Sequence, residues 1–202
     1  GNTATGRGGA ICSDRCYLGR TTCYQCTFYN NTAPAGGGGA MGTLDWRPAQ
    51  IPIPIWLNCI AWNNSSTFGQ TSGGQGSLGM AFCLIQEAAC PTGANCGNGM
   101  IYNKNPLFVN ALANDVHLLA CSPAVNTASG DYSSPIDFDG IARPQNGGYE
   151  MGAFEYVGTP CVLEAKCKNI SINLSAAGSI SVPASSIDNN STGCNVQLFI
   201  NN

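Results

Sequence analysis

The chain has 202 residues and a formal net charge of −3, and only 9% of its residues are charged although 44% are hydrophobic. Its eight Lys and Arg are scattered and form no basic run, which argues against a nucleic-acid partner. No apolar run approaches the ~20 residues of a membrane-spanning helix. The twelve cysteines favour an oxidising compartment outside the cytosol.

Two phrases recur in the first third of the chain. GGAI at 8–11 returns as GGAM at 38–41, and CTFYNN at 26–31 returns as CIAWNN at 59–64 and, more weakly, as CLIQ at 83–86. Self-similarity at a few tens of residues indicates a stacked repeat architecture. Because the first residues, GNTA, echo NTA at 31–33, we expect the chain to start within a repeat, with earlier coils and a signal peptide outside it.

Gly and Pro interrupt most of the first 100 residues, so the repeats predict short strands rather than helices. Residues 107–120 lack both and fit either a short helix or a strand. In the repeats, Cys26 and Phe28 fall on one face of a strand, which predicts an interior ladder. Asn30 and Asn63 fall at the strand exits, where asparagine tolerates left-handed backbone angles. This pattern predicts an all-β fold, a right-handed parallel β-helix.

The cysteine spacings leave several interpretations open. Cys23 and Cys26 form a C-x-x-C pair with Cys12 and Cys16 upstream, which would suit a zinc site, although exported proteins more often oxidise such pairs. Three recurring cysteines are predicted to fill the interior as small hydrophobes: Cys26, Cys59 and Cys83.

Two pairs of cysteines are predicted to be disulfide-bonded. Cys90 and Cys96 bracket a five-residue loop and predict a local disulfide. Cys167 and Cys194 could staple the C-terminal segment. The two bridges would stabilise the fold mainly by restricting the unfolded chain.

Acidic residues offer a weak calcium motif. Asp137 and Asp139 alternate before Gly140, as in a calcium loop, but no third acidic ligand follows at the right spacing. The alternative is a turn whose charges pair with neighbouring groups: Arg143, Glu150 and Glu155. The single histidine, His117, is assigned a structural role, because no nucleophile elbow accompanies it.

Two aromatic residues occupy equivalent positions in neighbouring repeats. Tyr29 and Trp62 fall on the outward face of their strands and could stack on sugar rings. They could equally pack against other parts of the chain, which is the interpretation we favour.

Five phrases carry a family resemblance, and they lie at 105–109, 115–118, 121–126, 137–144 and 148–156. Together they resemble the last coils and cap of secreted bacterial surface β-helix proteins with a choice-of-anchor domain, abundant in Bacteroidetes. The resemblance implies that residues 1–157 form the C-terminal coils and cap of a β-helix. After a linker, residues 158–202 resemble the start of an immunoglobulin-like module, with a hairpin over 170–182.

The resemblance implies secretion to the bacterial cell surface, by the type IX route. We expect a non-enzymatic adhesin or filament component that serves as a display and spacer scaffold in attachment or gliding, without a cofactor. Its expected partners are surface glycans or surface proteins, the secretion machinery, and other copies of the chain. The alternative is a polysaccharide lyase or hydrolase with its catalytic coils outside this segment.

Overall fold

A computed structural model describes residues 1–5, 8–14, 21–33, 38–44, 53–66, 72–74, 78–161, 164, 166–171 and 182–189. The chain divides into two compact units, Gly1–Thr159 and Pro160–Asn202, close to the boundary expected after residue 157. Within the second unit, the short 3-10 segment η3 (Ala184–Ser186) lies near a bridge between Cys167 and Asp188. The hairpin expected over 170–182 falls largely outside the described residues.

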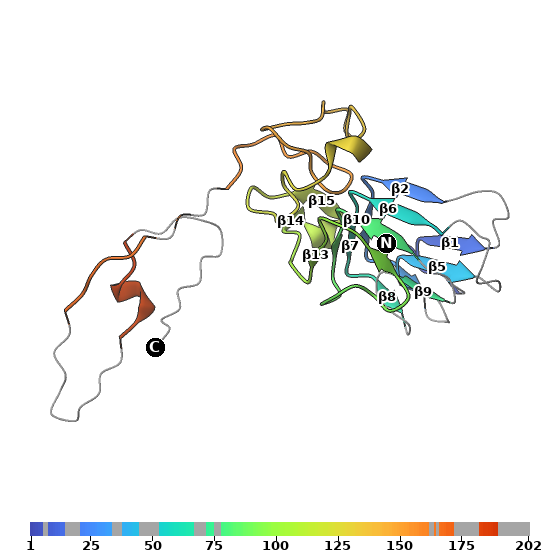
Figure 1. Cartoon of the computed structure of the whole chain (residues 1–202), viewed down its shortest axis with the longest axis horizontal. Coiled ribbons are helices and arrows are strands. Elements are labelled where there is room, and N and C mark those ends of the chain that lie inside the picture. The colour runs from blue at the N-terminus through green and yellow to red at the C-terminus, as the bar shows by residue number, and fades with distance from the viewer. Residues whose placement is uncertain are drawn as a thin grey trace, which may run out of the picture. The chain divides into compact units, whose positions relative to one another are not determined.

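Short β-strands recur in a fixed order along the first unit (Figure 1). Repeat 1 contains β1 (Ile11–Asp14), β2 (Thr22–Tyr24), β3 (Thr27–Tyr29) and β4 (Thr32–Ala33). Repeat 2 contains β5 (Met41–Leu44), β6 (Ile55–Leu57), β7 (Ile60–Trp62) and β8 (Ser65–Ser66). Repeat 3 contains β9 (Ser72–Gly74), β10 (Gly79–Ala81) and β11 (Leu84–Ile85), and repeat 4 contains β12 (Asn95–Cys96) and β13 (Ile101–Tyr102).

Equivalent strands of successive repeats pair side by side in parallel. The sheets have the orders β1-β5-β9, β12-β10-β6-β2, β13-β11-β7-β3 and β4-β8. Ile11 pairs with Met41, and Ile60 lies between Thr27 and Leu84. This register is the one that the repeated phrases predict. The structure therefore confirms an all-β unit built from short parallel sheets.

Among the described residues, helical structure is limited to three-residue 3-10 segments. The stretch at 107–120 is a hairpin, in which β14 (Phe108–Asn110) and β15 (Asp115–Leu118) pair in antiparallel around η1 (Ala111–Ala113). Asn110 caps η1 by accepting a hydrogen bond from the Ala113 N–H. Of the two alternatives for this stretch, a short helix or a strand, the structure has strands, because Phe108 pairs with Leu118 and Asn110 with Asp115 across the turn.

Side chains of different size, from adjacent strands, fill the interior between the parallel sheets. Cys23 of β2 lies opposite Trp56 of β6, which in turn lies opposite Met80 of β10. Phe28 of β3 lies opposite Ala61 of β7 and stacks on Trp56, with 4.4 Å between ring centroids. Large side chains beside small ones fill a narrow space without voids. These residues belong to one buried apolar cluster, as the predicted interior ladder requires.

A buried asparagine ladder joins the start of the chain to repeats 1 and 2. Asn31 Nδ2 donates to Asn64 Oδ1 at 2.8 Å, and Asn31 Oδ1 accepts from the Asn2 backbone N–H at 2.9 Å. Asn30 and Asn63, the positions predicted to turn the chain, have positive φ of 57° and 55°. Asn63 Nδ2 donates to Asn30 Oδ1 at 3.3 Å on the exposed side, and the buried ladder lies one residue further along, through Asn31 and Asn64, which are 4% and 3% exposed.

A lateral segment, residues 118–156, covers the outer face of the β13-β11-β7-β3 sheet. Ile60 of β7 and Leu84 of β11 are fully buried on that face, although Cys59 and Ala61 point inward. Four residues of the lateral segment complete this second apolar cluster: Leu118, Ala124, Val125 and Met151. The sheet is thus apolar on both faces, which is the pattern of a parallel sheet buried on both sides.

Polar contacts fix the lateral segment to the corners of repeats 1 and 2. Gln25 Oε1 accepts from the Ser134 N–H at 2.7 Å. Asn58 donates to the Ser129 carbonyl at 2.8 Å and accepts from the Ser129 N–H at 2.9 Å. We expected this segment to cap the end of the last repeat. Instead it runs back along the side of the sheets, because their outward apolar residues need covering.

Replacing Asn31 by alanine should lower the free energy of unfolding by about 1–3 kcal/mol, because the buried Asn64 amide loses its partner and Asn2 loses two hydrogen bonds. Denaturant unfolding with the disulfides intact measures this change. Asn30→Gly is the matched control: it is exposed, its φ is positive, and it should change stability by less than about 0.5 kcal/mol. Equal losses in the two variants would contradict the ladder.

Candidate functional site

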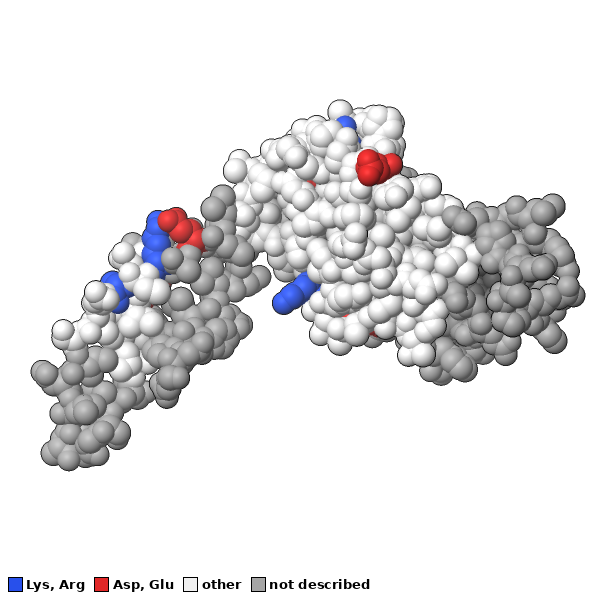
Figure 2. Space-filling view, in the orientation of Figure 1, with Lys and Arg blue, Asp and Glu red and all other residues white. Residues whose placement is uncertain are grey.

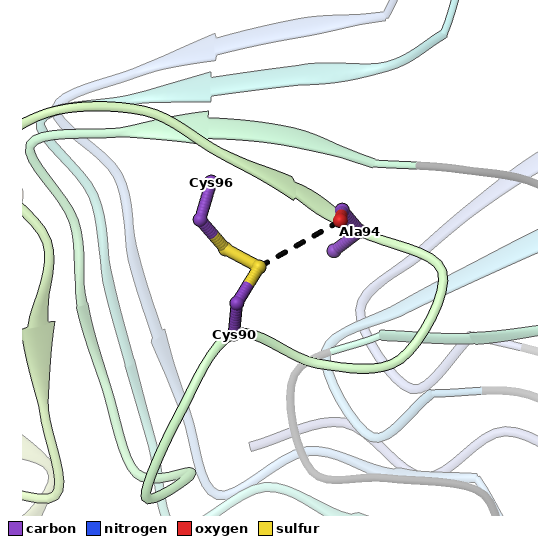
Figure 3. Close-up of a disulfide and its surroundings, with 3 residues drawn as sticks. All are labelled: Cys90, Ala94 and Cys96. Carbon is purple, nitrogen blue, oxygen red and sulfur yellow. Dashed lines mark hydrogen bonds between the residues drawn. A yellow bond between two sulfur atoms is a disulfide. The ribbon is translucent and has the colours of Figure 1, made fainter.

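The disulfide between Cys90 and Cys96, predicted from their spacing, is present (Figure 3). It closes a loop in which the Ala94 N–H donates to the Pro91 carbonyl at 2.9 Å, and Gly93 takes a positive φ of 83°. Cys96 belongs to β12, so the bond ties the loop to repeat 4.

Two further cysteines, Cys121 and Cys161, are also disulfide-bonded, and the sequence analysis did not single them out. The predicted bridge from Cys167 is wrong: Cys167 is an exposed thiol, and Cys194 lies outside the described residues. From the spacing of cysteines in a sequence, only disulfides that close short loops can be predicted. The disulfides indicate that the chain folds in an oxidising environment.

His117 lies between two carboxylates. Its Nδ1 is 2.6 Å from Asp115 Oδ1 and its Nε2 is 2.8 Å from Asp139 Oδ2. The ring also packs on Phe154, with centroids 3.9 Å apart. Hydrogen bonding to Asp139, and then to Asp115, raises the pKa of His117. Both ring nitrogens donate only when the ring is protonated, so the imidazolium holds β15 against the turn at 137–140.

The turn at 137–140 does not have the arrangement of a calcium site. Asp137 is buried, and its Oδ1 accepts from the N–H groups of Asp139 and Ile141. Its Oδ2 accepts from the Glu155 N–H at 2.8 Å. With these lone pairs used and Asp139 directed at His117, the two aspartates do not converge on a cation. The sequence motif reflects an Asx-type turn that the backbone needs.

A buried charge network lies beside this turn. Arg143 forms an ion pair with Glu155 at 2.8 Å, and both side chains are at most 1% exposed. Arg143 also donates to the carbonyls of Glu150 and Gly152. The predicted pairing of Asp139 with this group was wrong, because Asp139 bonds to His117 instead.

Glu150 is fully buried, and neither carboxyl oxygen has a hydrogen-bond partner. Burial, together with the negative charge of Glu155, raises the pKa of Glu150 to about 9. The Glu150 side chain is therefore a neutral acid at pH 7. The neighbouring Arg143 is already paired with Glu155, and no second cation among the described residues is available to Glu150. No local sequence signal separates Glu150 from Glu155, because both lie in one polar and aromatic run.

Both aromatic candidates for sugar contact are packed against protein. Tyr29 meets Phe108 of β14 edge-on, with centroids 5.4 Å apart. Trp62 is half-buried against the second apolar cluster. These contacts favour the packing interpretation. Sugar binding by the two residues stays a prediction.

A groove of about 440 Å³ lies between the edge of repeat 1 and the lateral segment. Residues 24–28 form one wall, and residues Ser134 and 136–138 contribute to the other. Tyr24 stacks on Tyr132 nearby, and Ile136 and Phe138 are 53% and 82% exposed. The groove therefore combines an apolar surface with amide and hydroxyl groups, and Cys26 is one of its lining residues.

The described surface carries few charges, and Figure 2 shows acidic and basic side chains as isolated spots on the visible face of the first unit. Within the described ranges, no three His, Cys, Asp or Glu side chains are grouped so that they could hold a metal ion. The same part of the chain contains no helix with the length and apolar character needed to cross a bilayer.

An NMR titration of His117, the single histidine of the chain, should give a pKa above 6.5, and Asp139→Asn should lower it. A raised pKa stabilises the fold below about pH 6.5, and that contribution is lost as pH rises through the folded-state value. The contacts of His117 with Asp115 and Asp139 therefore stabilise the fold more in acid. A pKa at or below 6.5, or one that Asp139→Asn leaves unchanged, would contradict it.

Glu150→Gln should raise the free energy of unfolding at pH 7 by about 1–3 kcal/mol, because no proton then has to be held in the buried site. With a folded-state pKa of about 9, the stability of the native chain falls as pH rises from 4.5 to 9, and the variant should flatten that slope. Chemical unfolding across this pH range measures both effects.

The matched control is Glu155→Gln in the same network. It leaves Arg143 buried without its carboxylate and should cost about 3 kcal/mol. Destabilisation by both substitutions would show that Glu150 is ionised in the folded chain.

Comparison of the chain with protein-family models, with curated proteins and with solved structures finds no match. The resemblance to bacterial surface proteins is accordingly carried by the sequence phrases alone.

Proposed function

We propose that the chain is an extracellular scaffold in which the four repeats are coils of a right-handed parallel β-helix. The observation that supports this best is the in-register pairing of equivalent strands, β2-β6-β10-β12 and β3-β7-β11-β13. In a stack of this kind each repeat pairs with the next and presents equivalent surface positions. Such a stack suits a spacer that holds a surface away from a cell.

The interior supports a static role. Its apolar cluster and its asparagine ladder fix the repeats relative to one another, and the buried Arg143–Glu155 pair fixes the lateral segment internally. The disulfides add restraint in an oxidising compartment. The half-exposed Asp115, His117 and Asp139 bond to one another, which favours a clasp over proton transfer to a substrate.

We further propose that the scaffold is an adhesin or filament component of a bacterial surface, exported by the type IX route. The sequence phrases at 105–156 carry this part of the proposal by analogy alone. Surface glycans, other surface proteins and further copies of the chain are the partners that fit a sparsely charged surface.

Beads coated with the oxidised full chain should be retained on immobilised polysaccharides or bacterial cells more than beads coated with the same chain after reduction and unfolding. The same polysaccharides, incubated with the soluble chain, should release no new reducing ends or unsaturated uronates. Product release would favour the polysaccharide-active alternative. Equal retention of folded and unfolded chain on every surface would contradict the adhesin.

A further inference from the structure

Four reduced cysteines gather in the interior of repeats 1 to 3. Cys26, Cys59 and Cys83 occupy equivalent positions, since the Ile60 N–H donates to the Cys26 carbonyl and the Leu84 N–H to the Cys59 carbonyl, both at 2.9 Å. The fourth, Cys23, is tied to them because Cys59 Sγ lies 3.4 Å from its carbonyl oxygen.

Cys23 and Cys26 form a pair across one corner of repeat 1. Gln25, between them, has a positive φ of 48°, which turns the chain from β2 into β3. Cys23 is buried in the first apolar cluster and Cys26 packs against that cluster. Hydrogen bonding between the two thiols lowers the pKa of Cys26 and raises the pKa of Cys23. Cys26 is thus the thiol that ionises first.

An exchange reaction needs an accessible attacking thiol and a more buried resolving thiol. Cys26 and Cys23 differ in exposure in this way. Cys26 is half-buried and lines the 440 Å³ groove, whereas Cys23 is 6% exposed and is not among the residues that line it. Cys59 and Cys83 are fully buried. Their thiols lie against backbone carbonyls, Cys59 at Leu57 and Cys83 at Ala81.

A metal site is the other use of clustered cysteines: within the described residues no group is arranged to hold a metal ion, and Cys16 of the four-cysteine zinc alternative lies outside them. The chain instead contains formed disulfides, so it encounters oxidants of the disulfide class. A reduced C-x-x-C pair that opens onto a groove is exposed to the same oxidants.

We propose that Cys23 and Cys26 form a thiol–disulfide exchange site, in which Cys26 attacks a small-molecule disulfide that enters the groove and Cys23 resolves the product.

The reaction balances with that disulfide as the only oxidant. The Cys26 thiolate forms a bond to one sulfur of the disulfide, its S–S bond breaks, and one small thiolate leaves. The Cys23 thiolate then attacks Cys26 Sγ, the mixed disulfide breaks, and the second small thiolate leaves. Two protein thiols are oxidised to one disulfide, the small disulfide is reduced to two thiols, and the protons of Cys23 and Cys26 pass to the leaving thiolates.

The test incubates the native full chain with oxidised glutathione, quenches it by alkylation, and maps the cysteines by mass spectrometry. Cleavage before aspartate places Cys23 and Cys26 in peptide 14–44 and Cys59 and Cys83 in peptide 45–114. The wild-type chain should lose two hydrogens within 14–44 through a Cys23–Cys26 bond. Cys26 should react at least ~10-fold faster than Cys83, because an accessible thiolate is the reactive form.

Cys23→Ser should trap Cys26 as a stable mixed disulfide with glutathione, which the wild type does not accumulate. The matched control, Cys83→Ser, should still close the Cys23–Cys26 bond. The wild-type measurement stands alone if a variant fails to fold. Either of two wild-type results would overturn the proposal: bonding of Cys26 to Cys59 or Cys16, or persistence of Cys23 and Cys26 as thiols that react no faster than Cys83.

Discussion

The lateral hydrogen bonding between equivalent strands is the constraint on which the rest of the first unit depends. Once Thr27, Ile60 and Leu84 are in register, every side chain in the phrase that follows has an equivalent neighbour 1 repeat away. Interior positions must then share a narrow space, which explains why cysteine, alanine and one large aromatic alternate there. Amide side chains at the exits must share hydrogen bonds, which explains the asparagine ladder.

The same constraint sets what the surface can do. A strand whose two faces are both apolar needs a cover, and the lateral segment supplies it while carrying six charged residues: Asp131, Asp137, Asp139, Arg143, Glu150 and Glu155. His117, Asp137, Arg143 and Glu150 all lie in or next to this cover, and their contacts hold it in place. Among the described residues, the buried ion pair lies in the cover and the packing of apolar side chains dominates beneath it.

The repeats could be predicted because strand pairing follows directly from self-similar phrases, and the register of CTFYNN on CIAWNN came from the sequence alone. The local Cys90–Cys96 bridge could be predicted because a six-residue separation limits its partner. The path of the lateral segment could not, because the burial of Ile60 on the outer face depends on residues about 90 positions away. The neutral state of Glu150 depends on the same packing, since burial rather than sequence shifts its pKa.

The long return of the lateral segment also has a consequence for how the chain is made. Ala153 donates to Thr27 Oγ1 across 126 positions, and Ser134 meets Gln25 across 109. Contacts of this separation raise the contact order of the unit, so we expect slow folding. During synthesis from the N-terminus, Ile60 and Leu84 emerge long before Met151 can cover them. The nascent chain therefore presents an uncovered apolar sheet to chaperones or export factors until its last third has been made.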